Sequence, residues 1–313
     1  MSFTSVTKKE LTQFEAEDCC RKAELSALVR MNGTVQLKPQ RVILDITTEN
    51  PSTARHVFSL LKHVYKVQPE VLVRRKVRLK KNHVYLIRIA TQANEILTDL
   101  GIFQPNTWKR VDGIDPRLVE KECCTRAYLR GSFLAGGSVN NPDSASYHLE
   151  IVSTYHDHSE ALCELMNQYR LHAKIIERKK GYVAYIKEGD KIGEFLNIIG
   201  AHPSLLHFEN VRIMKDMRNS VNRLVNCETA NLNKTIQAAM RQIENIQLID
   251  QEIGLDQLPD RLREVAETRL QNPELNLAEL GELIPSGKVS KSAINHRFRK
   301  IEEMAKKLRQ SRS

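Results

Sequence analysis

The chain carries one sequence motif twice, at a fixed separation. The first copy spans residues 19–35 and the second spans residues 123–139. A double cysteine, an alanine, a leucine, a glycine and a valine recur at one constant offset of 104 residues (123 − 19), which indicates internal duplication. In each copy, small and apolar residues recur near helical spacing, and a glycine follows as a C-cap before a strand. Because small residues let helix backbones approach closely, we expect the two helices to pack together at the pseudo-twofold seam of a duplicated domain.

The residues around the first motif predict the element order αββαββα. Asn50 and Pro51 supply a cap and a first-turn proline for one of the helices. After a short amphipathic segment at 7–13, the expected elements are a helix at about 17–32, strands at 34–37 and 41–48, a helix at 51–65, strands at 71–77 and 83–90, and a helix at 93–100.

The second half of the domain repeats this order. The expected elements are a helix ending at 136, a strand at 147–154, a helix at 157–170, strands at 174–178 and 182–187, and a helix at 192–199. We therefore expect repeats at about 15–101 and 119–200, within one domain of residues 1–220. The segment 101–116 joins the repeats. It contains the single tryptophan, Trp108, and three turn-forming dipeptides, which predict a packed bridging loop rather than a disordered one.

The helices of the two motifs resemble a known helix type. Residues 129–137, Leu-Arg-Gly-Ser-Phe-Leu-Ala-Gly-Gly, are similar to the LAGLIDADG helix of homing endonucleases, and residues 25–33 are similar to a weaker copy. The resemblance implies two paired sheets that form a saddle, and a metal-binding carboxylate just before each terminal glycine. Here those positions are Asn32 and Gly136, and neither supplies the anionic oxygen that a two-metal mechanism requires. We therefore expect a nuclease scaffold without enzymatic activity.

Basic residues gather on one hairpin of each repeat. Six of eight residues are basic in the first repeat, at Arg74, Arg75, Lys76, Arg78, Lys80 and Lys81. The matching residues of the second repeat are Arg178, Lys179 and Lys180. Paired basic segments fit phosphate contacts along a duplex, which supply affinity without reading sequence. The same residues also fit a solvated hairpin that has no partner.

Beyond Ser204 the pattern is wholly helical. The polar segment 222–231 is interpreted as a structural linker before helices at about 232–250 and 258–270. Asn276 and Glu279 have the spacing of a capping box for a short helix, and a turn then leads to a further helix from Ser290. This pattern predicts a helix-turn-helix at about 275–308, within a C-terminal domain of residues 221–313.

Positive charge concentrates in this last segment. From Pro285 to the end there are nine basic and two acidic residues, so the segment supplies +7 of the formal net charge of +10. Ile294, Phe298 and Ile301 recur at helical spacing and are expected to pack inward. The exposed face would carry side chains suited to adenine and guanine edges. The residues expected to contact DNA are Asn276, Lys288, Ser290, Lys291, Ser292, Asn295, His296, Arg297, Arg299 and Lys300.

The six cysteines form no C-x-x-C pair. Adjacent cysteines on one helix point about 100° apart, so one helix is not expected to clamp a metal with both. We interpret the double cysteines as buried small side chains at equivalent repeat positions, and expect no metal and no cofactor.

No apolar run approaches the roughly 20 residues of a membrane span, and the first residues lack a signal-peptide core. A cytoplasmic, nucleoid-associated location is expected.

Taken together, the motifs resemble the WhiA family of Gram-positive bacteria over essentially the whole chain. The most specific local matches are residues 226–231 and 290–297. The resemblance implies an α+β fold in which a degenerate LAGLIDADG-like saddle precedes an all-α domain with a helix-turn-helix similar to that of sigma-factor region 4. It also implies a transcription regulator that binds double-stranded DNA, tied to sporulation in some members and to cell division and chromosome segregation in others. Other regulators or RNA polymerase would be its protein partners.

The sequence leaves two other functions open. In one, the chain is an interaction module whose saddle binds a protein while only its tail touches DNA. In the other, it is an active DNA endonuclease with displaced ligands drawn from Asp143, Glu150 and Asp157. Separate binding assays on residues 1–220 and 221–313 would discriminate between these functions.

Overall fold

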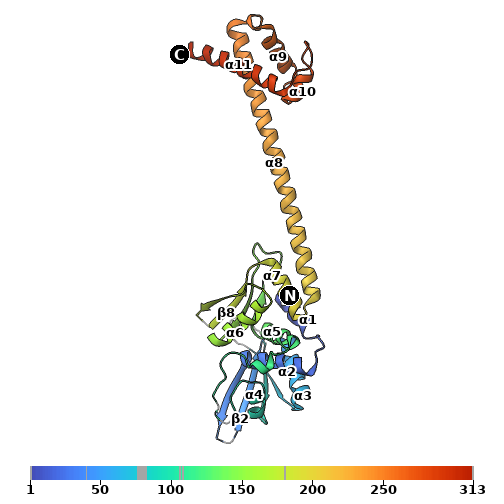
Figure 1. Cartoon of the computed structure of the whole chain (residues 1–313), viewed down its shortest axis with the longest axis vertical. Coiled ribbons are helices and arrows are strands. Elements are labelled where there is room, and N and C mark those ends of the chain that lie inside the picture. The colour runs from blue at the N-terminus through green and yellow to red at the C-terminus, as the bar shows by residue number, and fades with distance from the viewer. Residues whose placement is uncertain are drawn as a thin grey trace. The chain divides into compact units, whose positions relative to one another are not determined.

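The computed structural model describes residues 2–39, 41–75, 83–105, 107, 109–179 and 181–311. The chain divides into two compact units, Met1–Lys215 and Asp216–Ser313. Figure 1 shows the helices and strands of both units. One helix, α8 (His202–Ile253), begins in the first unit and ends in the second. Within the described ranges, no helix is both long and apolar enough to span a membrane.

The first repeat folds around a four-stranded antiparallel sheet with strand order β1-β2-β4-β3. Its predicted element order is confirmed. Asn50 caps α3 by accepting hydrogen bonds from the backbone amides of Ser52 and Thr53 at 2.9 and 3.1 Å. The elements are α2 (Asp18–Asn32), β1 (Gly33–Lys38), β2 (Arg41–Thr48), α3 (Pro51–Tyr65), β3 (Glu70–Arg75), β4 (His83–Ile89) and α4 (Ala93–Asp99).

The second repeat builds an equivalent sheet with strand order β5-β6-β8-β7. The register is also equivalent, because Gly33 pairs with Ile46 in the first sheet and Gly137 pairs with Ile151 in the second. The elements are α5 (Glu122–Gly136), β5 (Gly137–Val139), β6 (Leu149–Ser153), α6 (His156–Gln168), β7 (Lys174–Arg178), β8 (Gly181–Ile186) and α7 (Gly189–Ile199), with a short 3-10 helix η1 (Pro116–Leu118) before them.

The helix before the first repeat, α1 (Phe3–Leu11), starts earlier than the segment expected at 7–13. Ser2 explains the early start, because its hydroxyl caps the helix by accepting from the amide of Ser5 at 3.2 Å. Thr4 then ties α1 to the second repeat. Its hydroxyl accepts from the amide of Val139 at 2.9 Å and donates to the carbonyl oxygen of Val139 at 2.8 Å.

The helices α2 and α5 lie side by side in the middle of the first unit (Figure 1). Their backbones approach so closely at Gly131 that a Cβ atom there would lie 2.4 Å from the carbonyl oxygen of Glu24. The same atom would lie 3.0 Å from the Cβ of Ala27. The predicted seam between the repeats is therefore confirmed, together with the reason for its small residues.

The glycines that end these two helices are C-caps that lead into strands, as expected. Gly33 and Gly137 are both extended, with φ of −83° and −78°. A Cβ at Gly33 would lie 2.3 Å from the carbonyl oxygen of Val29, and a Cβ at Gly137 would lie 2.3 Å from the ring of Phe133. Glycine is needed because each helix turns directly into a strand against its own last turn.

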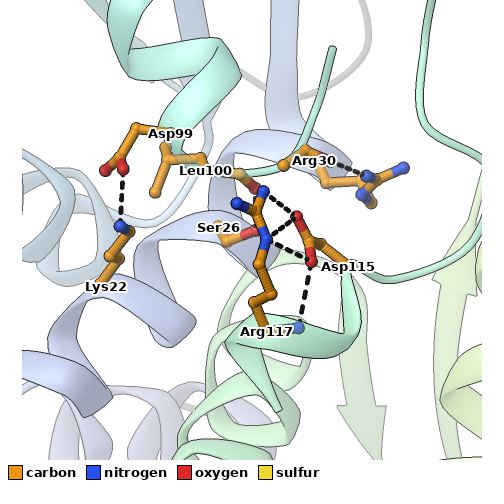
Figure 2. A network of polar contacts seen from close by, with 8 residues as sticks. Lys22, Ser26, Arg30, Asp99, Leu100, Asp115 and Arg117 are labelled. Carbon is orange, nitrogen blue, oxygen red and sulfur yellow. Dashed lines mark hydrogen bonds and ion pairs between the residues drawn. The ribbon is translucent and has the colours of Figure 1, made fainter. Parts of the chain in front are cut away.

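The segment between the repeats packs onto α2, as expected. Arg30 donates to the carbonyl oxygens of Gly101 at 2.7 Å and Val111 at 2.9 Å. Figure 2 shows Arg30 among the polar contacts that join α2 to this segment, with Asp115 close by. Trp108, which contributed to the expectation, lies outside the described residues.

Each sheet turns one face to the helices. Leu44, Ile46 and Ile87 of the first sheet and Ile151 and Ala184 of the second belong to one continuous core with α2 and α5. Because this core crosses the seam, the two repeats share it instead of each having its own. The other face of each sheet carries exposed residues such as Leu72 and Ile176 beside buried ones such as Leu86 and Val183.

The second unit has its own core, formed where the end of α8 meets three further helices. The polar segment 222–231, interpreted above as a linker, lies inside α8. The linker is therefore helical: the segment contains neither glycine nor proline, so nothing interrupts the helix despite its asparagines. The remaining elements are the 3-10 helix η2 (Leu255–Gln257), α9 (Asp260–Gln271), α10 (Leu277–Glu282) and α11 (Lys291–Ser311).

Candidate nucleic-acid interface and the degenerate catalytic seam

The predicted recognition helix is α11, and its two faces divide as the sequence pattern indicates. Ile294, Phe298 and Ile301 are 0, 5 and 1% exposed and pack in the core of the second unit. Amide and guanidinium groups on the opposite face are free to reach base edges. The exposed polar residues of this region are Ser290, Lys291, Ser292, Asn295, His296, Arg299 and Lys300.

Three residues of the predicted contact set already have partners within the unit. Asn276 forms a capping box with Glu279: its side chain accepts from the amide of Glu279 at 3.2 Å, and the Glu279 carboxylate accepts from the amide of Asn276 at 3.0 Å. The Lys288 ammonium lies 2.6 Å from the Glu282 carboxylate. Arg297 is half-buried and donates to a backbone carbonyl of α9 at 3.5 Å. These residues therefore position α10 and α11.

Sequence reasoning missed Arg269, which holds the helix-turn-helix together. This α9 side chain is 1% exposed and donates to the carbonyl oxygen of Leu275 at 2.7 Å. Its guanidinium also lies 5.5 Å from the centre of the Phe298 ring. Burial lowers the pKa of Arg269. Nothing in the sequence distinguishes it from Arg261 and Arg263 of the same helix, which are exposed and half-buried.

Gly281 is the second residue that the sequence did not single out. A Cβ atom at this position of α10 would lie 2.2 Å from the carbonyl oxygen of Val289. The amide of Val289 also donates to the carbonyl oxygen of Gly281 at 2.8 Å. The turn between α10 and α11 thus folds back directly onto the α10 backbone, and only glycine leaves room for it.

The carboxyl end of the α2–α5 seam is where the resemblance marks catalytic positions as degenerate. Asn32 lines a cleft of about 870 Å³ together with Lys8 of α1. Among the described residues that line this cleft, Glu49 alone carries a carboxylate. The Lys8 ammonium lies 5.8 Å from the centre of the Phe133 ring, and burial lowers the pKa of Lys8 to about 8. A lysine therefore lines the cleft in which an active enzyme would gather metal ligands.

Gly136, the second degenerate position, has no space for any side chain. A Cβ atom there would lie 2.5 Å from the carbonyl oxygen of Val152 and 2.7 Å from the Cε of Met31. The methionine end can move, but the backbone carbonyl belongs to a strand of the sheet. A carboxylate at this position would therefore require the sheet or the helix to shift.

The carboxylates considered as displaced metal ligands have other surroundings. Glu150 forms ion pairs with Arg178 and His148, each at 3.0 Å. Asp157 belongs to an exposed group with His156 and Glu160. In the part of the chain that the structure describes, Asp143, Glu150 and Asp157 do not gather in one cluster.

The basic hairpins are described only in part. Arg74 and Arg75 are exposed on β3, and Arg178 and Lys179 are exposed at the end of β7. Arg178 forms an ion pair with the Glu150 carboxylate of β6, across the intervening strand β8. The other members of the predicted phosphate-contact set, Lys76, Arg78, Lys80, Lys81 and Lys180, lie outside the described residues.

The two double cysteines meet at the amino ends of α2 and α5. The Sγ atoms of Cys19, Cys20, Cys123 and Cys124 all lie within 4.8 Å of one another. The expectation that neighbouring cysteines point apart is wrong for their sulfur atoms, because rotation about each Cα–Cβ bond brings the two Sγ atoms of a pair to 4.0 or 3.9 Å. Cys20 and Cys124 are buried, as expected, whereas Cys19 is half-buried and Cys123 is exposed. Burial raises the pKa of the Cys124 thiol to about 12.

Known protein families and a solved structure match nearly the whole chain. Three family models match it in succession: the WhiA N-terminal LAGLIDADG-like domain at residues 18–103, the WhiA LAGLIDADG-like domain at residues 125–218, and the WhiA C-terminal HTH domain at residues 221–305. The crystal structure of full-length DUF199/WhiA from Thermatoga maritima superimposes with a TM-score of 0.61 at 26% identity, covering 98% of this chain and 99% of that one.

Close relatives share the full length. A protein of Brevibacillus brevis named "Probable cell division protein WhiA" is 62% identical over 313 residues, covering 100% of this chain and 99% of that protein. A Bacillus licheniformis protein of the same name is 59% identical with the same coverage. The resemblance drawn from the duplicated motif and the helix-turn-helix is therefore confirmed. The chain belongs to the WhiA family.

Proposed function

We propose that this chain is a DNA-binding transcription regulator that selects its sites through α11 and does not cut DNA. The observation that carries the proposal is the division of α11, whose apolar residues are buried while Asn295 and Arg299 are exposed. Such a helix, held against a capped first helix, can lie in the major groove and read base edges. The relatives are named for cell division, and we propose that process here, with sporulation and chromosome segregation as further outputs.

Selection from a randomised duplex library tests site recognition. The full chain is incubated with the library at physiological salt, and the bound duplexes are recovered, amplified and sequenced. We expect one shared sequence to be enriched, because exposed amide and guanidinium groups discriminate between base pairs. Equal retention of all sequences would remove site selection from the proposal and leave only non-specific binding.

The full chain supplied with Mg²⁺ or Mn²⁺ is expected to leave supercoiled plasmid DNA intact on a gel. The seam offers Asn32, Gly136 and Lys8 where metal-binding carboxylates are required. We expect Asn32→Asp combined with Gly136→Asp to remain inactive as well, because the added Cβ at position 136 meets a backbone oxygen at 2.5 Å. Cleavage by the wild-type chain that survives purification and stops with a chelator would favour the endonuclease alternative.

The exposed basic residues of the saddle are proposed to contact phosphates. Arg75→Ala combined with Lys179→Ala should weaken binding to all duplexes alike and flatten the logarithmic salt dependence by roughly one unit per lost contact. The preference for a selected site should not change, because phosphates carry no sequence information. Titrations at several salt concentrations measure both quantities.

A matched control removes the same charge from the helical side of the first repeat. Arg55 and Lys62 are exposed on α3, and Arg55→Ala combined with Lys62→Ala should leave the salt slope nearly unchanged. If both double variants changed the slope equally, the effect would come from net charge and not from contacts on the hairpins.

One observation favours a protein-binding saddle as the second candidate. Leu72 and Leu86 pair on the sheet face turned away from the core, and Ile176 and Val183 pair at the equivalent place in the second sheet. Leu72 is 38% exposed and Ile176 is 47% exposed, whereas their partners Leu86 and Val183 are buried. If a regulator or RNA polymerase docks there, the hairpin variants should keep the DNA affinity and salt slope of the wild type but lose regulation in cells.

A further inference from the structure

Among the described residues, one group of metal-ligating side chains consists of cysteines and belongs to neither the catalytic cleft nor the basic hairpins. It is the group of four thiols where the amino ends of α2 and α5 meet. The distance between the two sulfur atoms is 4.0 Å for Cys19 and Cys20, and 3.9 Å for Cys123 and Cys124. Each repeat thus contributes one pair, and the degenerate catalytic cleft lies at the other end of the same helices.

These separations suit a single tetrahedral metal ion. A zinc–sulfur bond of about 2.3 Å places the sulfurs of a regular tetrahedron about 3.8 Å apart. The two adjacent pairs are already within a few tenths of an ångström of that value, and all six separations are at most 4.8 Å. We propose that Cys19, Cys20, Cys123 and Cys124 together bind one thiophilic divalent metal ion of the zinc type.

Other occupants fit this sulfur set less well. A disulfide requires about 2.05 Å between sulfur atoms, whereas all four cysteines are free and the sulfurs of each adjacent pair lie at nearly twice that distance. An iron–sulfur cluster inserts several irons and sulfides between its ligands, and would spread the thiolates further apart than a single ion does. Hard cations such as Mg²⁺ prefer oxygen ligands. Four sulfurs in so small a space therefore favour one soft ion.

The surroundings can balance the charge of such a site. A divalent ion with four thiolates carries a net charge of about −2. Both helices point their positive amino ends at the cluster, and neither end is capped by a side chain. Lys121 and Arg126 line the cavities beside the cluster. Three further cations there, Lys22, Arg117 and Arg130, are paired with Asp99, Asp115 and Glu24.

Carboxylates also lie near the cluster, and they do not replace the sulfur ligands. Glu17 lies 3.9 Å from the sulfur of Cys19, and Glu122 lines the same cavity as Cys123. Because Cys123 is exposed, an ion can enter from solvent on this side. A closed site with four protein ligands has no open position for a substrate, so the ion would be structural and would join the two repeats.

Co²⁺ is the probe for this site, because its tetrahedral tetrathiolate complexes give intense visible bands and near-ultraviolet charge-transfer bands. The full chain, purified with reductant and without oxygen, is stripped of metal and titrated with Co²⁺. We expect those bands to saturate at one ion per chain and to disappear when Zn²⁺ is added. Saturating Zn²⁺ should also raise the melting temperature by about 5–10 °C over the metal-free chain.

Three variants make the test specific. Cys20→Ser and Cys124→Ser should abolish the tetrathiolate spectrum. Cys123→Ser should do the same, and because Cys123 is exposed its loss cannot unfold the core. Cys227→Ser, an exposed cysteine on α8 outside the cluster, should leave the spectrum and metal content unchanged.

Any of three results would overturn the proposal. One is a reduced full chain that binds no Co²⁺ while all six thiols react with a thiol reagent after unfolding. Another is Cys123→Ser retaining the spectrum of the wild type. A disulfide within the cluster, found by mass spectrometry in protein kept free of oxygen, would likewise replace the metal site with a covalent link.

Discussion

Replacing Arg299 with alanine is expected to reduce the preference for a selected site over random duplex DNA by about 5- to 150-fold, the equivalent of about 1–3 kcal/mol. The side chain is exposed on α11 and takes no part in the core beneath it. Asn295→Ala should have an effect of the same order, since an asparagine amide matches the donor and acceptor pattern of adenine. Competition titrations of the full chain against labelled site DNA measure the preference directly.

Lys307 provides the matched control on the same helix. It is exposed and lies about two turns beyond Arg299. Lys307→Ala should lower affinity for every duplex by a similar factor and leave the preference unchanged. If Arg299→Ala and Asn295→Ala both kept the wild-type preference with an intact circular dichroism spectrum, α11 would not be the reading helix.

Arg130→Met is expected to destabilise the first unit by about 3–5 kcal/mol, because it leaves a buried carboxylate without its cation. Arg130 and Glu24 are 3% and 1% exposed. Their side chains are joined across the α2–α5 seam at 2.9 and 3.0 Å. His56 contacts the other oxygen of Glu24, at 2.8 Å, and cannot replace a guanidinium that donates through two nitrogens to Oε2. Urea denaturation followed by the fluorescence of Trp108, which belongs to this unit, measures the loss.

Two controls separate the ion pair from general packing. Arg126, one turn earlier on α5, is half-buried and donates to the carbonyl oxygen of Ile198 at 2.9 Å. Arg126→Met should therefore cost about 1 kcal/mol. The double variant Glu24→Gln with Arg130→Met should recover much of the lost stability, because no buried charge remains. A double variant no more stable than Arg130→Met would show that the loss comes from packing.

Local signals predicted much of the fold. The strand at 41–48 and the helix at 51–65 have the bounds expected from β-branched residues and from the Asn50–Pro51 cap. The burial of Ile294, Phe298 and Ile301 on α11 also followed from their helical spacing alone. The uninterrupted length of α8 did not follow from local signals. Its asparagine-rich part lacks a clear apolar face, although no residue there stops a helix.

Features that depend on two distant segments could not be predicted from the sequence. Cys19 and Cys123 belong to repeats whose helices meet only in the folded unit, so reasoning about one helix at a time placed their neighbours apart. Arg269 and Gly281 act through contacts with Leu275, Phe298 and Val289. Such contacts depend on the turn that brings the helices together, and no spacing rule encodes them.

The seam also imposes an order of events while the chain is being made. Glu24 and Arg130 are 106 residues apart, and synthesis at about 5–20 residues per second leaves α2 waiting roughly 5–20 s for α5. During that interval Ala23 and Ala27, which are fully buried in the finished unit, have nothing to cover them. Neighbouring chains made on one messenger RNA present the same uncovered helix. The misassembly most favoured by this architecture is therefore the pairing of α2 from one nascent copy with α5 from another.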